Sequence, residues 1–182
     1  MVWNLPNLLT AARILLIPFF VGFAHLPGKL GLLLATGFFS LAAITDWADG
    51  YVARRRGLHT NFGRFFDPVA DKLLVICALV LLVAMGRANL ILVMILLSRE
   101  VIIMALRERM SGLGSVVHVS VMSKWKTGFQ MTAIIMLLVQ DALFGIPFQL
   151  PGQFFLFLSA ALALFSGYTY MNEAWPKLRA ST

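Results

Sequence analysis

Six long apolar runs restrict the folds that this chain can adopt. They are bounded by charged or turn residues and lie at about residues 8–26, 30–54, 65–86, 88–108, 125–143 and 152–173. Each is close to the roughly 20 residues that a helix needs to cross the hydrocarbon core of a bilayer. The chain has 182 residues, 60% of them hydrophobic and only 13% charged, which leaves no room for a separate soluble module. We predict an all-α integral membrane protein, a single domain over residues 1–182 with six transmembrane helices.

The basic residues are distributed unevenly between the two ends of these predicted spans. Ten fall on one face, against Lys29 and Arg87 on the other. The ten are Arg54, Arg55, Arg56, Arg64, Arg107, Arg109, Lys124, Lys126, Lys177 and Arg179. Loops rich in Lys and Arg stay in the cytoplasm, so this face is predicted to be cytoplasmic. Six spans then place both termini on the cytoplasmic side of the plasma (inner) membrane, in a multi-pass topology.

The N-terminal residues and the net charge indicate contact with lipid headgroups. Residues 1–7 include Trp3 and Pro6 and predict a short interfacial segment before the first span. The formal net charge of +7 favours anionic lipid headgroups or phosphates as partners. Nucleic acid is not expected as a partner, because no soluble basic face remains beside the spans.

Charged residues on the second and third spans lie deeper than the membrane surface. Only 16 charge-free residues separate Lys29 from Asp46, and only 14 separate Lys72 from Arg87. Both stretches are shorter than the roughly 20 residues that cross the hydrocarbon core. Ionisable groups at such depth are costly and usually face a polar cavity with a function.

Four of the eight acidic residues lie close together on these two spans. Asp46 and Asp49 are spaced i, i+3, and Asp67 and Asp71 are spaced i, i+4, so each pair shares one face of a helix. A hairpin of the two spans would bring the pairs together, where repulsion requires neutralising cations. Oxygen ligands without His or Cys suit Mg²⁺ or Mn²⁺ bound to substrate phosphates.

Small residues follow the same helical face as the first aspartate pair. Gly50 and Ala53 continue the spacing of Asp46 and Asp49, and they leave space for a flat base or a diphosphate near the backbone. Arg54 comes next and is a candidate partner for a diphosphate.

Written out, this stretch is Asp46-x2-Asp49-Gly50-x2-Ala53-Arg54-x8-Gly63-x3-Asp67-x3-Asp71. It resembles the signature of the CDP-alcohol phosphotransferase family at every fixed position. The resemblance implies six transmembrane helices, usually in a homodimer, with an active site that opens to the cytoplasm. It also implies one or two divalent cations held by Asp46, Asp49 and Asp67, with Asp71 completing the cluster as the candidate base. Gly50, Ala53, Arg54 and Gly63 would line the CDP pocket, which Thr10 approaches.

Further motifs resemble one branch of that family, which joins CDP-diacylglycerol to sn-glycerol 3-phosphate and releases CMP. They are Asn4 to Thr10 with Arg13, Asp67 to Lys72, Arg99-Glu100, Leu106-Arg107-Glu108 and Lys124-x-Lys126-Thr127-x-x-Gln130. Ser123 differs, because bacterial members often have glycine there. The resemblance implies attack by the 1-hydroxyl of glycerol 3-phosphate, which gives phosphatidylglycerophosphate.

Such an acceptor carries its own phosphate and requires a second basic site on the same face. The candidates are Arg99, Arg107, Lys124 and Lys126, and arginine favours bidentate phosphate binding.

Three alternative functions fit parts of the pattern. A sister enzyme of the same family would use another acceptor, as in a cardiolipin synthase. A membrane prenyltransferase also binds a lipid diphosphate through aspartates, but with two separated motifs and more spans. A divalent cation transporter would place its acidic residues near the midplane, within reach of both faces.

Overall fold

The chain folds into a helical bundle. The structure, a computed structural model, describes residues 5–56, 61–113, 121–139 and 147–179, with residues 5–13, 46–56 and 61–71 described as backbone only. Within these ranges it contains six helices and no strand: α1 (Leu5–Ala24), α2 (Lys29–Arg56), α3 (Asn61–Ala84), α4 (Leu90–Gly112), α5 (Val121–Val139) and α6 (Gln149–Arg179).

Each predicted span coincides with one of these helices, so the all-α prediction is confirmed. By length and composition, α6 is the helix in the described ranges that is long and apolar enough to cross a membrane. The transmembrane character of the other five stays a prediction. α1 begins at Leu5, within the predicted interfacial segment of residues 1–7, and residues 1–4 lie outside the described ranges.

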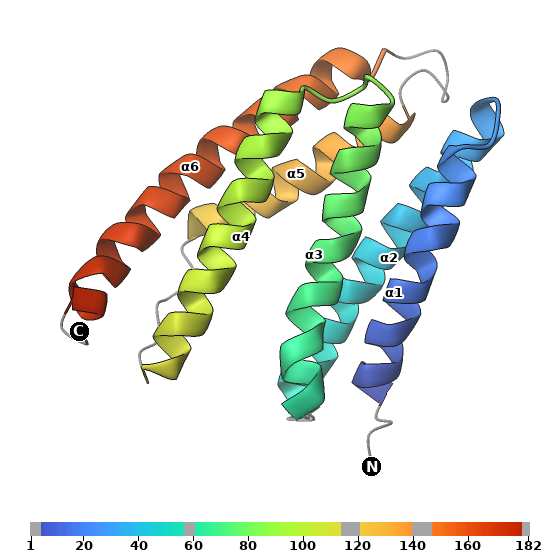
Figure 1. The fold of residues 1–182 in the computed structure, drawn as a ribbon. Coiled ribbons are helices and arrows are strands. Elements are labelled where there is room, and N and C mark those ends of the chain that lie inside the picture. Colours follow the sequence, from blue (N-terminus) through green and yellow to red (C-terminus); the bar gives the residue numbers. More distant parts are fainter. Residues whose placement is uncertain (1–4, 57–60, 114–120, 140–146, 180–182) are drawn as a thin grey trace.

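Two turns lie at the upper end of the bundle in Figure 1. Gly28 ends the turn between α1 and α2 with φ 87°, and Gly86 lies between α3 and α4 with φ 68°. Residues with a Cβ rarely adopt this left-handed backbone, so glycine is required at both positions. Asn89 then caps α4, because its side-chain oxygen accepts hydrogen bonds from the backbone N–H of Ile91 at 2.9 Å and of Leu92 at 3.3 Å.

The helices form one main core and a smaller second cluster. In Figure 1, α5 and α6 run obliquely to the more upright α1 and α3, and α5 passes behind α4. α5 packs closely on α6, where a Cβ at Gly152 would lie 2.8 Å from the Leu137 side chain. The second cluster joins the ends of α4 and α6 through Ile103, Met110, Tyr170 and Ala174.

Several helices continue beyond the apolar runs that predicted them. α4 extends to Gly112 and α6 to Arg179, past charged residues that were assigned to the membrane surface. α6 also begins at Gln149, three residues before the predicted span, and includes Pro151 in its first turn. Proline is tolerated there because the first N–H groups of a helix have no intrahelical partner.

Candidate active site

The predicted aspartates lie on two consecutive helices at corresponding depths. Asp46 stands ten residues before the end of α2, and Asp71 ten residues after the start of α3. Asp49 lies seven residues before the end of α2, and Asp67 lies six residues after the start of α3. The backbone is helical at all four positions, as the i, i+3 and i, i+4 spacings required. The side chains of all four lie outside the described part.

The connection between the two helices is too short to separate them widely. Four residues, 57–60, join Arg56 to Asn61. With 3.8 Å between successive Cα atoms, the ends of α2 and α3 lie within about 19 Å of each other. α2 therefore delivers its aspartates to the same end of the bundle at which α3 begins, which Figure 1 shows as the lower end.

The other predicted donor-site residues share these helices. Gly50, Ala53 and Arg54 lie on α2, Gly63 lies on α3 and Thr10 lies on α1. Their side chains are also outside the described part. A divalent cation fits the four predicted aspartates. They offer carboxylate oxygens, without histidine or cysteine, on two helices that meet at one end. Among the described side chains, no group of three or more His, Cys, Asp or Glu residues that could hold a metal ion occurs.

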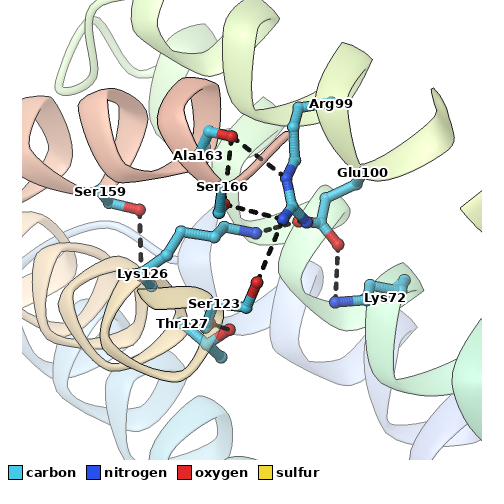
Figure 2. Close-up of polar contacts among 9 residues, drawn as sticks. All are labelled: Lys72, Arg99, Glu100, Ser123, Lys126, Thr127, Ser159, Ala163 and Ser166. Atoms are coloured by element: carbon cyan, nitrogen blue, oxygen red, sulfur yellow. Dashed lines mark hydrogen bonds and ion pairs between the residues drawn. The ribbon is translucent and has the colours of Figure 1, made fainter. Parts of the chain in front are cut away.

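The polar centre of the described bundle is Glu100 on α4. Three cations converge on its carboxylate, as Figure 2 shows. Its Oε2 pairs with Lys72 Nζ of α3 at 2.7 Å, and its Oε1 accepts a hydrogen bond from Arg99 Nη1 at 3.2 Å and pairs with Lys126 Nζ of α5. Glu100 is buried, with 8% of its surface exposed. Both oxygens of this buried carboxylate therefore have cationic partners. This is expected, because a buried charge without a partner would be strongly destabilising.

Arg99 connects α4 to α5 and α6. Its Nη2 donates to Ser166 Oγ at 3.0 Å and to Ser123 Oγ at 3.4 Å, and its Nε donates to the Ala163 carbonyl at 3.4 Å. The hydroxyl of Ser123 therefore has a partner in this protein. The guanidinium is already held by protein groups on three helices.

The four predicted acceptor residues have different environments. Lys126 is only 2% exposed and paired with Glu100, whereas Lys124 is exposed on the same turn of α5. Arg107 is exposed near the end of α4, and its guanidinium lies over the Tyr170 ring at 5.6 Å from the centroid. The structure thus brings Arg99 and Lys126 together at Glu100 and leaves Arg107 and Lys124 open to the surface. Their predicted role as phosphate ligands stays a prediction.

A small cavity adjoins the Glu100 cluster. Lys72, Glu100, Thr127 and Gln130 line it with apolar neighbours, and its volume of about 20 Å³ suits about one water molecule. The side-chain Nε2 of Gln130 is buried without a hydrogen-bond partner among the described groups. A larger apolar cleft of about 620 Å³ lies between α4 and α6, with Arg99 in its wall.

Sequence reasoning missed most of this cluster. It noted Glu100 as a neighbour of Arg99, but it did not connect Glu100 with Lys72 or Lys126, which lie 28 and 26 positions away. Ser123 and Ser166 gave no signal as hydrogen-bond acceptors because serines are common within apolar helices. The one available signal was the position of Glu100, an acidic residue inside an apolar run, which requires a cationic partner.

Comparisons with known proteins give a consistent result over nearly the whole chain. A profile of the family described as CDP-alcohol phosphatidyltransferase matches residues 3–166. The chain is 42% identical to the CDP-diacylglycerol–glycerol-3-phosphate 3-phosphatidyltransferase of Pseudomonas fluorescens, over 97% of this chain and 92% of that protein. It is 39% identical to the protein of the same name from Bacillus subtilis, over 98% and 99% of the two chains. The counterpart from Haemophilus influenzae is 41% identical over 96% and 95%. With the aspartate signature on two adjoining helices, these matches show that the chain belongs to the CDP-alcohol phosphatidyltransferase family.

Proposed function

We propose that the protein transfers the phosphatidyl group of CDP-diacylglycerol to the 1-hydroxyl of sn-glycerol 3-phosphate. The products are phosphatidylglycerophosphate and CMP. The observation that carries the proposal is the near full-length similarity, at 38–42% identity, to proteins named for this reaction. The complete aspartate signature on α2 and α3 supports it.

The reaction breaks one phosphoanhydride bond and forms one phosphoester bond. The 1-hydroxyl oxygen of the acceptor attacks the phosphorus that bears diacylglycerol, and the bond from that phosphorus to the oxygen of CMP breaks. Asp71 takes the hydroxyl proton, and CMP leaves as the phosphate monoester. Gly50, Ala53, Arg54 and Gly63 hold the CDP group near the α2 backbone, with Thr10 of α1 close to it.

Asp46, Asp49, Asp67 and Asp71 would hold one or two Mg²⁺ or Mn²⁺ ions. Such ions neutralise the diphosphate and stabilise the charge on the leaving phosphate. The chain's own contribution is to place four carboxylates on two helices joined by four residues. The arginines of α2 and α3 offset part of this negative charge.

The acceptor phosphate requires cations near the same end of the bundle. Arg107 and Lys124 are the exposed candidates, and Arg99 and Lys126 lie deeper around Glu100. A phosphate monoester with two negative charges loses much hydration on binding, so more than one cation must compensate it. This requirement favours glycerol 3-phosphate over an uncharged acceptor.

We place the protein in the plasma membrane with its active site towards the cytoplasm and both termini on that side. The apolar exterior supports this location, since Leu30, Ile91 and Leu150 are each more than two-thirds exposed. The charge asymmetry supports the orientation. We also propose a homodimer, on the strength of the family resemblance.

The test is an assay of CMP release by the purified protein in detergent. CDP-diacylglycerol would be offered with glycerol 3-phosphate, phosphatidylglycerol, glycerol or inositol. We expect Mg²⁺-dependent or Mn²⁺-dependent release with glycerol 3-phosphate and little with the others. Preference for phosphatidylglycerol would instead identify a cardiolipin synthase.

A further inference from the structure

Glu100 has no part in the reaction proposed above, yet it occupies the polar centre of the bundle. Its Oε2 is taken by Lys72, and its Oε1 by Arg99 and Lys126. A carboxylate whose oxygens both have cationic partners does not bind a phosphate, because the two groups are negatively charged and repel each other. Any contribution to the reaction must therefore act through the cations that it holds.

The contact with Lys72 reaches the helix of the proposed base. Lys72 follows Asp71 directly on α3, so their Cα positions differ by about 1.5 Å along the helix axis. The 2.7 Å pair between Lys72 Nζ and Glu100 Oε2 fixes this turn of α3 against α4. The Lys72 side chain is 34% exposed, against 2% for Lys126, so it is the open member of the cluster.

The contact with Lys126 reaches the helix that carries the acceptor candidates. Lys126 lies two residues after the exposed Lys124 on α5, and its own backbone carbonyl accepts a hydrogen bond from Ser159 of α6 at 3.1 Å. One carboxylate therefore joins α3, with the aspartates, to α5, with the basic residues, from its place on α4 (Figure 2).

Resting on the phosphatidyl transfer proposed above, we propose that Glu100 is a positioning residue for the phosphate-bearing acceptor. It holds α3 and α5 in the register at which the acceptor hydroxyl meets Asp71 while the acceptor phosphate meets the basic residues of α4 and α5. The donor lipid, bound by α2 and the start of α3, depends less on this register. Loss of Glu100 should therefore change the kinetics of the acceptor far more than those of the donor.

The experiment compares Glu100→Gln, Glu100→Asp and Lys72→Gln in the detergent assay of CMP release. Each rate is divided by the amount of folded protein. We expect Glu100→Gln to lower kcat/KM for glycerol 3-phosphate about 10- to 100-fold, by analogy with the loss typical when a hydrogen-bond partner that orients a metal ligand is removed. The KM for CDP-diacylglycerol should change less than about threefold, and Glu100→Asp should recover part of the loss because it keeps the charge. Glu173→Gln and Lys177→Gln, at exposed positions of α6, are the matched controls and should behave as wild type.

A double-mutant cycle tests whether Glu100 acts through Lys72. Lys72 is partly exposed, so Lys72→Gln should fold even if Glu100→Gln does not. We expect Lys72→Gln to reproduce much of the acceptor defect, and the double variant to be little worse than the more impaired single one, because effects along one path are not additive. If the losses in kcat/KM of the two single variants multiplied in the double variant, Glu100 would not act through Lys72.

The outcomes separate this inference from the proposed function. No CMP release by the wild type with glycerol 3-phosphate would contradict the proposed function. An active wild type, with a lower melting temperature but unchanged KM and kcat in Glu100→Gln and Lys72→Gln, would show that the cluster is only structural. That result would overturn the positioning role and leave the proposed function intact.

Discussion

At the scale of single residues, the aspartates of α2 and α3 lead to a prediction about metal binding. Asp46→Asn or Asp67→Asn should abolish turnover and weaken divalent-cation binding, because a neutral amide is a poor ligand for a hard cation. Turnover would be measured as CMP release, and Mn²⁺ binding by electron paramagnetic resonance. Full activity of the wild type in EDTA would contradict the prediction.

Loss of Asp71 should impair the chemical step, whereas loss of any of the other three aspartates should impair metal binding. Asp71→Asn should lower kcat about 10²- to 10⁴-fold, the usual contribution of a general base. CDP-diacylglycerol should still bind in the presence of metal, as equilibrium binding of the labelled lipid would show. If Asp71→Asn weakened CDP-diacylglycerol binding as much as Asp46→Asn does, Asp71 would act mainly as a metal ligand.

The acceptor residues should separate by their exposure. Arg107→Gln should raise KM for glycerol 3-phosphate about 10- to 150-fold, from roughly 1.5–3 kcal/mol per charge-assisted contact. It should lower stability by no more than about 1 kcal/mol, through loss of the cation–π contact with Tyr170. Lys126→Gln should raise KM and also lower the melting temperature, because Glu100 loses a buried partner. Added Mg²⁺ should rescue neither variant. Unchanged KM in both variants would contradict phosphate binding, and would leave Arg107 as part of the cytoplasmic positive charge and Lys126 as a structural partner of Glu100.

Residues on one helix could be related from sequence, whereas residues on different helices could not. The spacing of Asp46 with Asp49 is a local property of a helix, and the helical backbone at both positions confirms its basis. The convergence of Lys72, Glu100 and Lys126 depends on the angle at which α3, α4 and α5 cross. No periodicity within one segment carries that information, so the cluster emerged only from the three-dimensional arrangement.

At the scale of helices, α5 and α6 pack closely at Gly152. Gly152→Val should lower the free energy of unfolding by about 1–3 kcal/mol, because added methyl groups would overlap Leu137, 2.8 Å from the Cβ position. Thermal unfolding in detergent would measure the change. Gly128→Ala on α5 is the control, since its Cβ would meet nothing within 4 Å. Equal melting temperatures for both variants would contradict close packing at Gly152.

Helices were predicted reliably where apolar residues run without interruption, and less well at their polar ends. α5 begins at Val121, four residues before the predicted span, and α6 ends six residues after it. Hydropathy marks where a segment leaves the hydrocarbon core, but backbone hydrogen bonds continue into water without a change of geometry. The ends of α4 and α6 also stabilise each other through Tyr170 and Met110, a contact invisible in either segment alone.

At the scale of the whole molecule, the uneven distribution of charge predicts orientation. The chain has one cysteine, Cys77, so a Cys77→Ser background allows single cysteines to be placed at Leu26 and Ser111, both exposed and at opposite ends of the bundle. A membrane-impermeant maleimide should label Leu26→Cys in intact spheroplasts and Ser111→Cys only after permeabilisation. The reverse pattern would overturn the proposed orientation.

The apolar packing beyond the Glu100 cluster has a consequence for the growth of the bilayer. Between that cluster and the turns at Gly28 and Gly86, the core is built from side chains such as Phe39, Leu82 and Leu138, all fully buried. A phosphorylated glycerol headgroup would lose its hydration in such surroundings and does not pass them. In the proposed orientation, each turnover therefore adds its lipid product to the inner leaflet alone. Equal expansion of the outer leaflet must then depend on a separate lipid-translocating activity.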